Sequence, residues 1–292
     1  MHPQEIATCI ISLSKDEPPI LGASLYNWLN GFLLLGTRNG DKKRGEAKAL
    51  RALILSDIHS NLEALAAVVA DAMDRGGFDA IWCLGDVVGY GPDPGPCIEL
   101  IRRYELLAVA GNHDHGAVGK ASVENFNYAA KTAIHWTSGQ LSAEYAQFLA
   151  NLPTVITAEP FTMVHGSLRD SLNEYLLEEE SALATLALMQ TPFCLVGHSH
   201  IPFICQENSG SPQFIQFVQD QVYPLGDERL IVNPGCVGQP RDRDPRPSYA
   251  IYDSQAETIQ RRRVTYSIQD TQKKMRAANL PQYLVERLNL GI

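Results

Sequence analysis

The feature that most constrains the fold is a series of short apolar runs, each followed within two residues by a polar residue that could bind a ligand. Five such runs end at residues 55, 84, 110, 164 and 196. After the first run, Leu62, Leu65, Ala66 and Val69 recur at helical spacing, so the pattern indicates strand, loop and helix. Strands that alternate with helices are typical of a mainly parallel sheet covered on both faces. The sequence therefore predicts an α/β fold.

The second half of the chain has a different pattern. Short apolar runs at 231–232, 248–252 and 258–262 predict further strands, so this half is expected to be richer in β-structure and partly antiparallel. Residues 267–289 predict two short helices that are divided at Pro281, because proline favours the start of a helix and disfavours its continuation. Residues 1–50 differ in composition and are predicted to be an appended N-terminal extension; residues 51–292 form the main domain.

Composition excludes several classes of protein. The formal net charge is −9 at pH 7, which disfavours binding to the phosphate backbone of bulk nucleic acid. The six cysteines form no CxxC pair, which favours a reduced, cytoplasmic setting. The apolar stretch at 21–35 is shorter than the ~20 residues that a membrane helix needs. We therefore expect neither export nor membrane anchoring.

The residues at the strand ends are of the types that bind metal ions. They combine carboxylate, imidazole and amide groups, and the candidate ligands are Asp57, His59, Asp86, Asn112, His165, His198 and His200. Carboxylate and imidazole together suit Mn, Fe, Zn, Co or Ni, and no cysteine follows a predicted strand. Seven ligands exceed the needs of one tetrahedral ion, so two ions bridged by a carboxylate are the simplest arrangement.

The order of these residues resembles a known family. The motifs are Asp57-Ile58-His59, Gly85-Asp86, Gly111-Asn112-His113-Asp114, His165-Gly166 and Gly197-His198-Ser199-His200. All five resemble, in order, the signature of the calcineurin-like metallophosphoesterase superfamily. The stretches 85–92 and 233–241 resemble a compact bacterial phosphodiesterase-like branch of it, and the similarity extends over about residues 51–290. The resemblance implies a four-layer α/β/β/α sandwich.

The resemblance also implies roles for individual residues. One divalent metal ion would be held by Asp57, His59, Asp86 and His200, and the other by Asp86, Asn112, His165 and His198. Asp86 would thus bridge the two ions, of which manganese is the expected kind, and a hydroxide bound between them would attack phosphorus. His113 would donate a proton or a hydrogen bond to the leaving oxygen, and Asp114 would orient it.

Other residues near these motifs have two possible roles. Arg241 could bind a substrate phosphate, but Asp242 and Asp244 in the same loop make local ion pairs equally plausible. Tyr90 and Tyr128 could stack on a base, although we expect both in the core. Asn61 is expected to cap the following helix. Cys236 stands where the branch motif suggests serine, which leaves the substrate preference open at that position.

The expected function is metal-dependent hydrolysis of a small phosphoester, with a phosphodiester or nucleotide as the substrate implied by the resemblance. A phosphatase acting on phosphoproteins or small phosphomonoesters is the alternative within enzymes. A non-catalytic binding scaffold is the alternative outside them, and the complete set of candidate ligands argues against it. The sequence predicts neither the natural substrate nor the oligomeric state.

Overall fold

The computed structural model describes residues 49–292 of the chain. The extension predicted for residues 1–50 lies outside the described residues except at its last two positions. The strands are β1 (Arg51–Leu55), β2 (Ala80–Cys83), β3 (Glu105–Ala108), β4 (Val155–Ala158), β5 (Phe161–Val164), β6 (Phe193–Leu195), β7 (Phe203–Asn208), β8 (Ser211–Ile215), β9 (Val222–Pro224), β10 (Leu230–Asn233), β11 (Ser248–Asp253) and β12 (Thr258–Arg263). The helices are α3 (Leu62–Asp74), α4 (Pro94–Ile101), α5 (Asn112–Ala117), α6 (Tyr128–Gln140), α7 (Ala143–Asn151), α8 (Glu179–Leu188), α9 (Ile268–Ala277) and α10 (Gln282–Arg287).

The strands form two mixed six-stranded sheets. The first has the order β3-β2-β1-β11-β12-β9, and the second has the order β4-β5-β6-β10-β7-β8. Strands β1, β2 and β3 are parallel, as their alternation with helices predicts, and so are β5, β6 and β10. Strand β11 pairs antiparallel with both β1 and β12, which makes the first sheet mixed instead of mainly parallel.

Large aromatic side chains link the two sheets. The ring of Trp82 on β2 lies 5.4 Å from that of Phe161 on β5, and Phe161 lies 4.8 Å from Tyr252 on β11. All three are almost completely buried. Offset and edge-to-face contacts of this kind add to the free energy gained from burying the rings. Part of the interior between the two sheets is therefore a cluster of packed aromatic rings.

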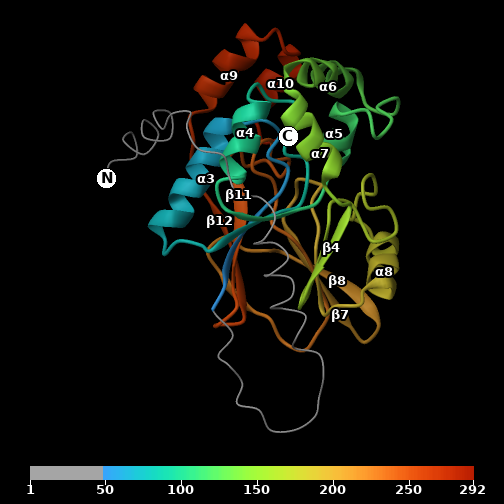
Figure 1. The fold of residues 1–292 in the computed structure, drawn as a ribbon. Coiled ribbons are helices and arrows are strands. Elements are labelled where there is room, and N and C mark those ends of the chain that lie inside the picture. Colours follow the sequence, from blue (N-terminus) through green and yellow to red (C-terminus); the bar gives the residue numbers. More distant parts are fainter. Residues whose placement is uncertain (1–48) are drawn as a thin grey trace. The chain divides into compact units, whose positions relative to one another are not determined.

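Helices cover the outer faces of the sheets (Figure 1). Apolar side chains of α3 and α4 join the core of the first sheet, while α8 packs against the second sheet through Ala182 and Leu186. The predicted C-terminal helices are present as α9 and α10, and Pro281 is the N-cap of α10. The expected α/β fold of two sheets with outer helices is confirmed.

The candidate ligands follow from this topology. The parallel register pairs Leu55 of β1 with Cys83 of β2, and Cys83 with Ala108 of β3, so these strands end side by side. Open α/β sheets bind ligands at the carboxyl ends of such strands. The loops that carry Asp57, Asp86 and Asn112 therefore leave the sheet at the same edge.

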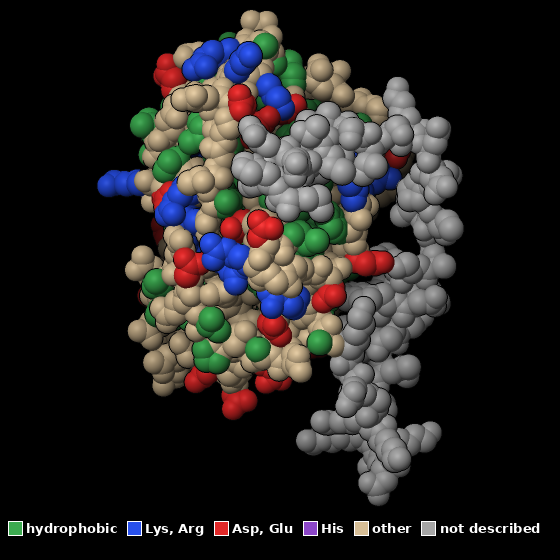
Figure 2. All heavy atoms as spheres, turned by 90° about the vertical axis from the view of Figure 1, so that its left-hand side faces the viewer, with side chains coloured by type: hydrophobic (Ala, Val, Ile, Leu, Met, Phe, Trp, Pro, Cys, Tyr) green, Lys and Arg blue, Asp and Glu red, His purple; other side chains and the backbone are tan. Residues whose placement is uncertain are grey.

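The surface that carries α3 bears acidic and basic side chains that are interspersed (Figure 2). None of the helices in residues 49–292 is long and apolar enough to cross a membrane.

Candidate metal centre

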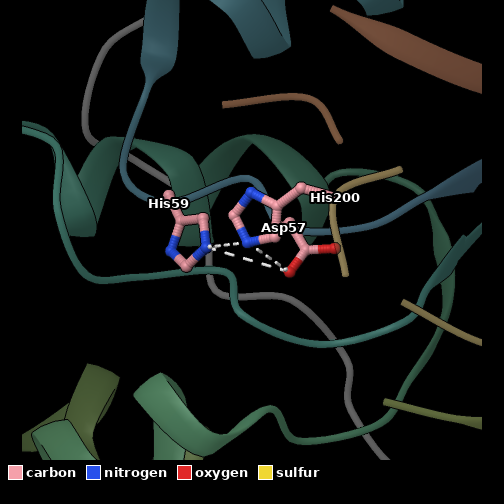
Figure 3. Close-up of side chains that lie close together, drawn as sticks. All are labelled: Asp57, His59 and His200. Carbon is pink, nitrogen blue, oxygen red and sulfur yellow. Dashed lines mark hydrogen bonds and ion pairs between the residues drawn. The ribbon is translucent and has the colours of Figure 1, made fainter. Parts of the chain in front are cut away.

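One group of candidate ligands comprises Asp57, His59 and His200 (Figure 3). Asp57 and His59 follow β1, and His200 follows β6. Oδ1 of Asp57 lies 3.2 Å from Nε2 of His200, and the two Nε2 atoms of His59 and His200 are 3.2 Å apart. All three side chains are buried. The structure thus brings three donor atoms from distant segments to one point.

A second group comprises Asp86, His165 and His198. Oδ2 of Asp86 lies 3.4 Å from Nε2 of His165, which is 3.1 Å from Nδ1 of His198. The amide oxygen of Asn112 also lies 3.2 Å from Nε2 of His165. A carboxylate, two imidazoles and an amide oxygen therefore surround a second point.

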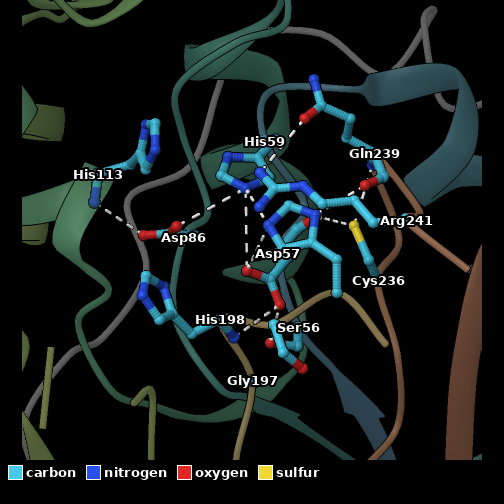
Figure 4. Close-up of polar contacts among 12 residues, drawn as sticks. Ser56, Asp57, His59, Asp86, His113, Gly197, His198, Cys236, Gln239 and Arg241 are labelled. Atoms are coloured by element: carbon cyan, nitrogen blue, oxygen red, sulfur yellow. Dashed lines mark hydrogen bonds and ion pairs between the residues drawn. The ribbon is translucent and has the colours of Figure 1, made fainter. Parts of the chain in front are cut away.

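Asp86 faces both groups. Its Oδ2 lies 3.6 Å from Nε2 of His59 in the first group (Figure 4). The same oxygen lies 3.4 Å from Nε2 of His165 in the second group. Its other oxygen, Oδ1, accepts a hydrogen bond of 2.8 Å from the main-chain N–H of His113. That bond orients the carboxylate so that one oxygen remains between the two groups.

The four histidines are held by main-chain carbonyl groups. Nδ1 of His59, His165 and His200 contacts the carbonyl oxygens of Val88, Leu84 and Gln239, at 3.1, 2.8 and 2.7 Å. His198 is turned the other way, and its Nε2 contacts the carbonyl oxygen of Asn173 at 3.1 Å. A carbonyl can only accept, so each of these ring nitrogens is the donor. The remaining nitrogen of each neutral ring then presents a lone pair to the centre.

The positions of these ring nitrogens and of the Asp57 carboxylate show whether the residues fit metal ions. Nitrogens of two rings face each other at 3.2 Å in the first group and at 3.1 Å in the second. In the first group burial lowers the pKa of both rings, so two lone pairs would repel there unless a cation lies between them. In the second group either a cation or a proton on His165 can lie between the rings. Oδ1 of Asp57 is buried and has no hydrogen-bond partner among the described residues. Buried carboxylates of this kind are normally paired or bound to metal. The donor set fits two divalent cations.

Burial and neighbouring charges set the pKa values of these groups. Burial lowers the pKa of His59 well below its usual range and that of His198 to about 3, which keeps both rings neutral. Burial would also lower the pKa of His165, but the adjacent Asp86 carboxylate outweighs it and raises the value to about 9. Burial would raise the pKa of Asp57, yet the His200 imidazole lowers it. The metal-free centre therefore holds a proton on His165 that a cation would displace.

The backbone at the ligands is unusual. Asp57, His59, Asp86, His198 and His200 all have positive φ angles, between 48° and 62°. Non-glycine residues in this left-handed region cost about 1–3 kcal/mol each and persist only where the surrounding structure holds them. Such residues concentrate at functional sites. Here the conformation turns successive side chains of each loop toward the same centre.

Two glycines allow the loops after β2 and β3 to approach each other. Gly85 has φ +92°, and a Cβ there would lie 2.6 Å from the main-chain nitrogen of Gly111. A Cβ on Gly111 would overlap Oδ1 of Asp86. The contact between these loops thus requires glycine at both positions, because a side chain at 85 would overlap the main chain of Gly111 and one at 111 would displace the Asp86 carboxylate.

Gly111→Ala is expected to lower the free energy of unfolding by about 1–3 kcal/mol, the usual cost of overpacking, and to lower metal affinity by shifting Asp86. Gly139→Ala is the matched control, because a Cβ there meets nothing within 4 Å and the residue lies in helix α6. In this control the free energy of unfolding should rise by about 0.5–1 kcal/mol. Urea unfolding of both variants measures the difference, and equal stabilities would contradict the tight approach.

His113 lies beside this centre, and its ring contacts those of Tyr90 and Phe126 at 4.4 and 4.7 Å between centroids. Burial lowers its pKa to about 4. The resemblance implied that Asp114 orients this ring, but the Asp114 carboxylate makes its hydrogen bonds elsewhere. At the third position of α5 its carboxylate points back to the helix start, where it accepts hydrogen bonds from the N–H groups of Gly111 and Val88. Nδ1 of His113 has no hydrogen-bond partner among the described residues.

A cavity of about 320 Å³ opens onto the centre. Its described lining comprises Asp86, Tyr90, Asn112, His113, Asn125, Phe126, Asn127, Ala130, Asn173, Tyr175, His198, His200 and Arg241. Sequence reasoning missed Asn173 and Tyr175. Asn173 holds His198 through its carbonyl oxygen, and the ring of Tyr175 stacks on His198 at 4.0 Å. Neither residue follows a strand directly, so the pattern of strand ends contained no signal for them.

The structure places the other residues near the motifs in different surroundings. Asn61 caps α3 by accepting a hydrogen bond from the N–H of Ala64, as predicted. Tyr90 is buried but also lines the cavity. The prediction that Tyr128 is in the core is wrong, because at the first turn of α6 its side chain is 85% exposed. Cys236 lies beneath the site, where its thiol donates to the carbonyl oxygen of Asp57 at 3.2 Å, and it does not line the cavity.

Comparisons with known proteins agree with this geometry. Residues 50–257 match the model of the calcineurin-like phosphoesterase superfamily domain. A curated protein of Methanocaldococcus jannaschii, described as uncharacterized, is 39% identical over 243 residues, which are 82% of this chain and 97% of that protein. A metallophosphoesterase crystal structure from Sphaerobacter thermophilus is 43% identical with a TM-score of 0.76, covering 84% of this chain and all of that one.

A hypothetical protein from Pyrococcus horikoshii has the same fold at only 18% identity, with a TM-score of 0.69 over 83% of this chain and 98% of that one. The family model spans every predicted ligand from Asp57 to His200. The fold, the two groups of candidate ligands and the sequence match therefore agree, and the chain belongs to the calcineurin-like phosphoesterase superfamily.

Proposed function

We propose that the protein is a metal-dependent hydrolase of phosphodiester or nucleotide-type substrates. The observation that carries the proposal is the pair of opposed imidazole nitrogens, 3.2 Å apart at His59 and His200 and 3.1 Å apart at His165 and His198. Two complete, buried groups of candidate ligands argue against a non-catalytic binding scaffold. Membership of a phosphoesterase family supports hydrolysis as the reaction.

The donor atoms divide between two ions. Asp57, His59, Asp86 and His200 would hold one, and Asp86, Asn112, His165 and His198 would hold the other, so that Asp86 is shared. Oxygen and nitrogen ligands without a thiolate suit manganese, which we propose as the ion. When bound, two such cations neutralise charge on a phosphoryl group and lower the pKa of water.

The chain itself would supply the contacts to the leaving group. His113 lines the cavity, and its main-chain N–H donates to Asp86, which supports the proposal that its side chain would give a proton or a hydrogen bond to the leaving oxygen. Asp114 is a positioning residue, because its two hydrogen bonds to main-chain N–H groups tie the start of α5 to the loop at Val88. Both residues thus lie in the first turn of α5, beside the centre.

Metal reconstitution tests this proposal. The purified protein is stripped of metal and then assayed with bis(4-nitrophenyl) phosphate and 4-nitrophenyl phosphate after addition of Mn, Fe, Zn, Co or Ni. We expect hydrolysis that depends on metal, together with binding of two ions per chain. Binding of two ions without hydrolysis of any phosphoester would contradict the enzyme, and failure to bind metal would favour the scaffold.

A further inference from the structure

The cavity contains a cation that the described chain does not neutralise. Arg241 lines the cavity and forms no ion pair with any carboxylate in residues 49–292. Its Nε is buried and has no hydrogen-bond partner among those residues. Its Nη2 makes only long contacts to neutral oxygens, 3.4 Å to the hydroxyl of Tyr90 and 3.5 Å to the side chain of Gln239.

The acidic residues of the same loop are paired elsewhere. Asp242 forms an ion pair with Arg263, and Asp244 forms one with Arg246. The acidic residues of this loop therefore do not neutralise the charge of Arg241, although the sequence left local ion pairs as one of its two possible roles. Of the residues that line the cavity within the described chain, Asp86 is the only acidic one, and it faces the histidines.

Arg241 also lies close to the first group of ligands. Its main-chain N–H donates to the carbonyl oxygen of His200 at 3.5 Å, and its guanidinium lies 5.9 Å from the centre of the Tyr90 ring. That ring is in turn 4.5 Å from the ring of His59. Figure 4 shows the side chain of Arg241 running from the segment of Cys236 and Gln239 toward His59. The free charge is thus beside the point where phosphorus would react.

A part-buried charge without a partner destabilises a protein, unless the partner arrives with a ligand. Guanidinium groups bind phosphate oxygens through paired N–H donors. We infer that Arg241 selects a substrate that carries a second negative charge on phosphate beside the bond that is cut. This inference rests on the proposed function, and it narrows the substrate to phosphates that are more highly charged than a simple monoanionic diester.

The second charge can have two sources, which matched substrates distinguish. In the first pair, 4-nitrophenyl phosphate carries the second charge on the reacting phosphoryl group itself, and bis(4-nitrophenyl) phosphate lacks it. In the second pair, thymidine 5′-(4-nitrophenyl phosphate) with a 3′-phosphate carries the second charge on that neighbouring phosphate, and the same compound without the 3′-phosphate lacks it. In each pair, the ratio of kcat/KM for the more charged substrate to that for the less charged one measures selection by charge.

Arg241→Gln is expected to lower this ratio by about 10- to 100-fold in one of the two pairs, since a charge-assisted contact has that effect. Arg241→Lys should recover part of the loss, because it keeps the charge but loses the paired donors. Arg243→Gln is the control from the same loop, as Arg243 is exposed and does not line the cavity. An unchanged ratio in both pairs for Arg241→Gln would overturn the inference.

Calorimetric binding of inorganic phosphate to the manganese-loaded protein gives a readout that does not require turnover. Arg241→Gln should weaken this binding by about 10- to 100-fold, and unchanged affinity would overturn the inference. Its Tm should stay the same or rise, because an unpaired charge is removed. A lower Tm with unchanged phosphate affinity would indicate a structural role. If no substrate is hydrolysed, the proposed function fails, while phosphate binding still decides the role of Arg241.

Discussion

Replacing Asp86 with asparagine should reduce kcat by about a thousandfold or more while the fold persists. Its Oδ2 lies within 3.6 Å of both His59 and His165, so this change removes one negative charge from both proposed metal sites at once. A bound cation supplies several kcal/mol of charge stabilisation in the transition state, and every 1.36 kcal/mol changes a rate tenfold. Steady-state kinetics and metal analysis of the purified variant measure both effects.

Asp79→Asn is the matched control for this substitution. Asp79 accepts a hydrogen bond from the N–H of Arg51 at an exposed position and lies outside both groups of ligands. It should keep full activity and two ions per chain. Asp86→Asn should retain the far-ultraviolet circular dichroism of the unmodified protein. Unmodified rates in Asp86→Asn would refute a bridging role for this carboxylate.

Replacing His113 with alanine should lower kcat by about 10²- to 10⁴-fold, the usual contribution of a positioned proton donor. The loss should be larger for an alkyl ester than for a 4-nitrophenyl ester, because an alkoxide leaving group depends more on protonation. That dependence on the leaving group separates a role in catalysis from a role in packing, which would affect both esters equally. Kinetics with the two esters therefore measure the role directly.

Two further variants control the His113 experiment. His113→Gln keeps a side-chain N–H donor and should recover part of the activity if His113 acts by hydrogen bonding. His135→Ala removes an exposed histidine of α6 and should change neither ester's rate. Equal losses for both esters in His113→Ala would contradict the assigned contact with the leaving oxygen.

Much of the centre could be predicted because its residues follow strands. Asp57, Asp86 and Asn112 come after three strands that pair in parallel, so the rule for strand ends already places them at one edge. His165 and His198 follow two parallel strands of the other sheet. The convergence of the two sheets was implied only by the family resemblance, because no local pattern reports how sheets pack.

Other features could not be predicted, and each has a physical reason. Asn173 acts through its main-chain carbonyl, which no residue identity reveals. Whether Arg241 is paired depends on where Asp242 and Asp244 point, and that is decided by Arg263 on β12 and by Arg246. The exposure of Tyr128 shows that an aromatic residue at a helix start need not face the core.

The most direct test of the proposed centre is anomalous scattering from crystals of the protein grown with manganese. A dinuclear centre predicts two peaks roughly 3.5–4 Å apart, the usual separation in two-metal sites. One peak should contact His59 and His200, the other should contact His165 and His198, and Asp86 should contact both. A single peak, or peaks that lie away from these histidines, would contradict it.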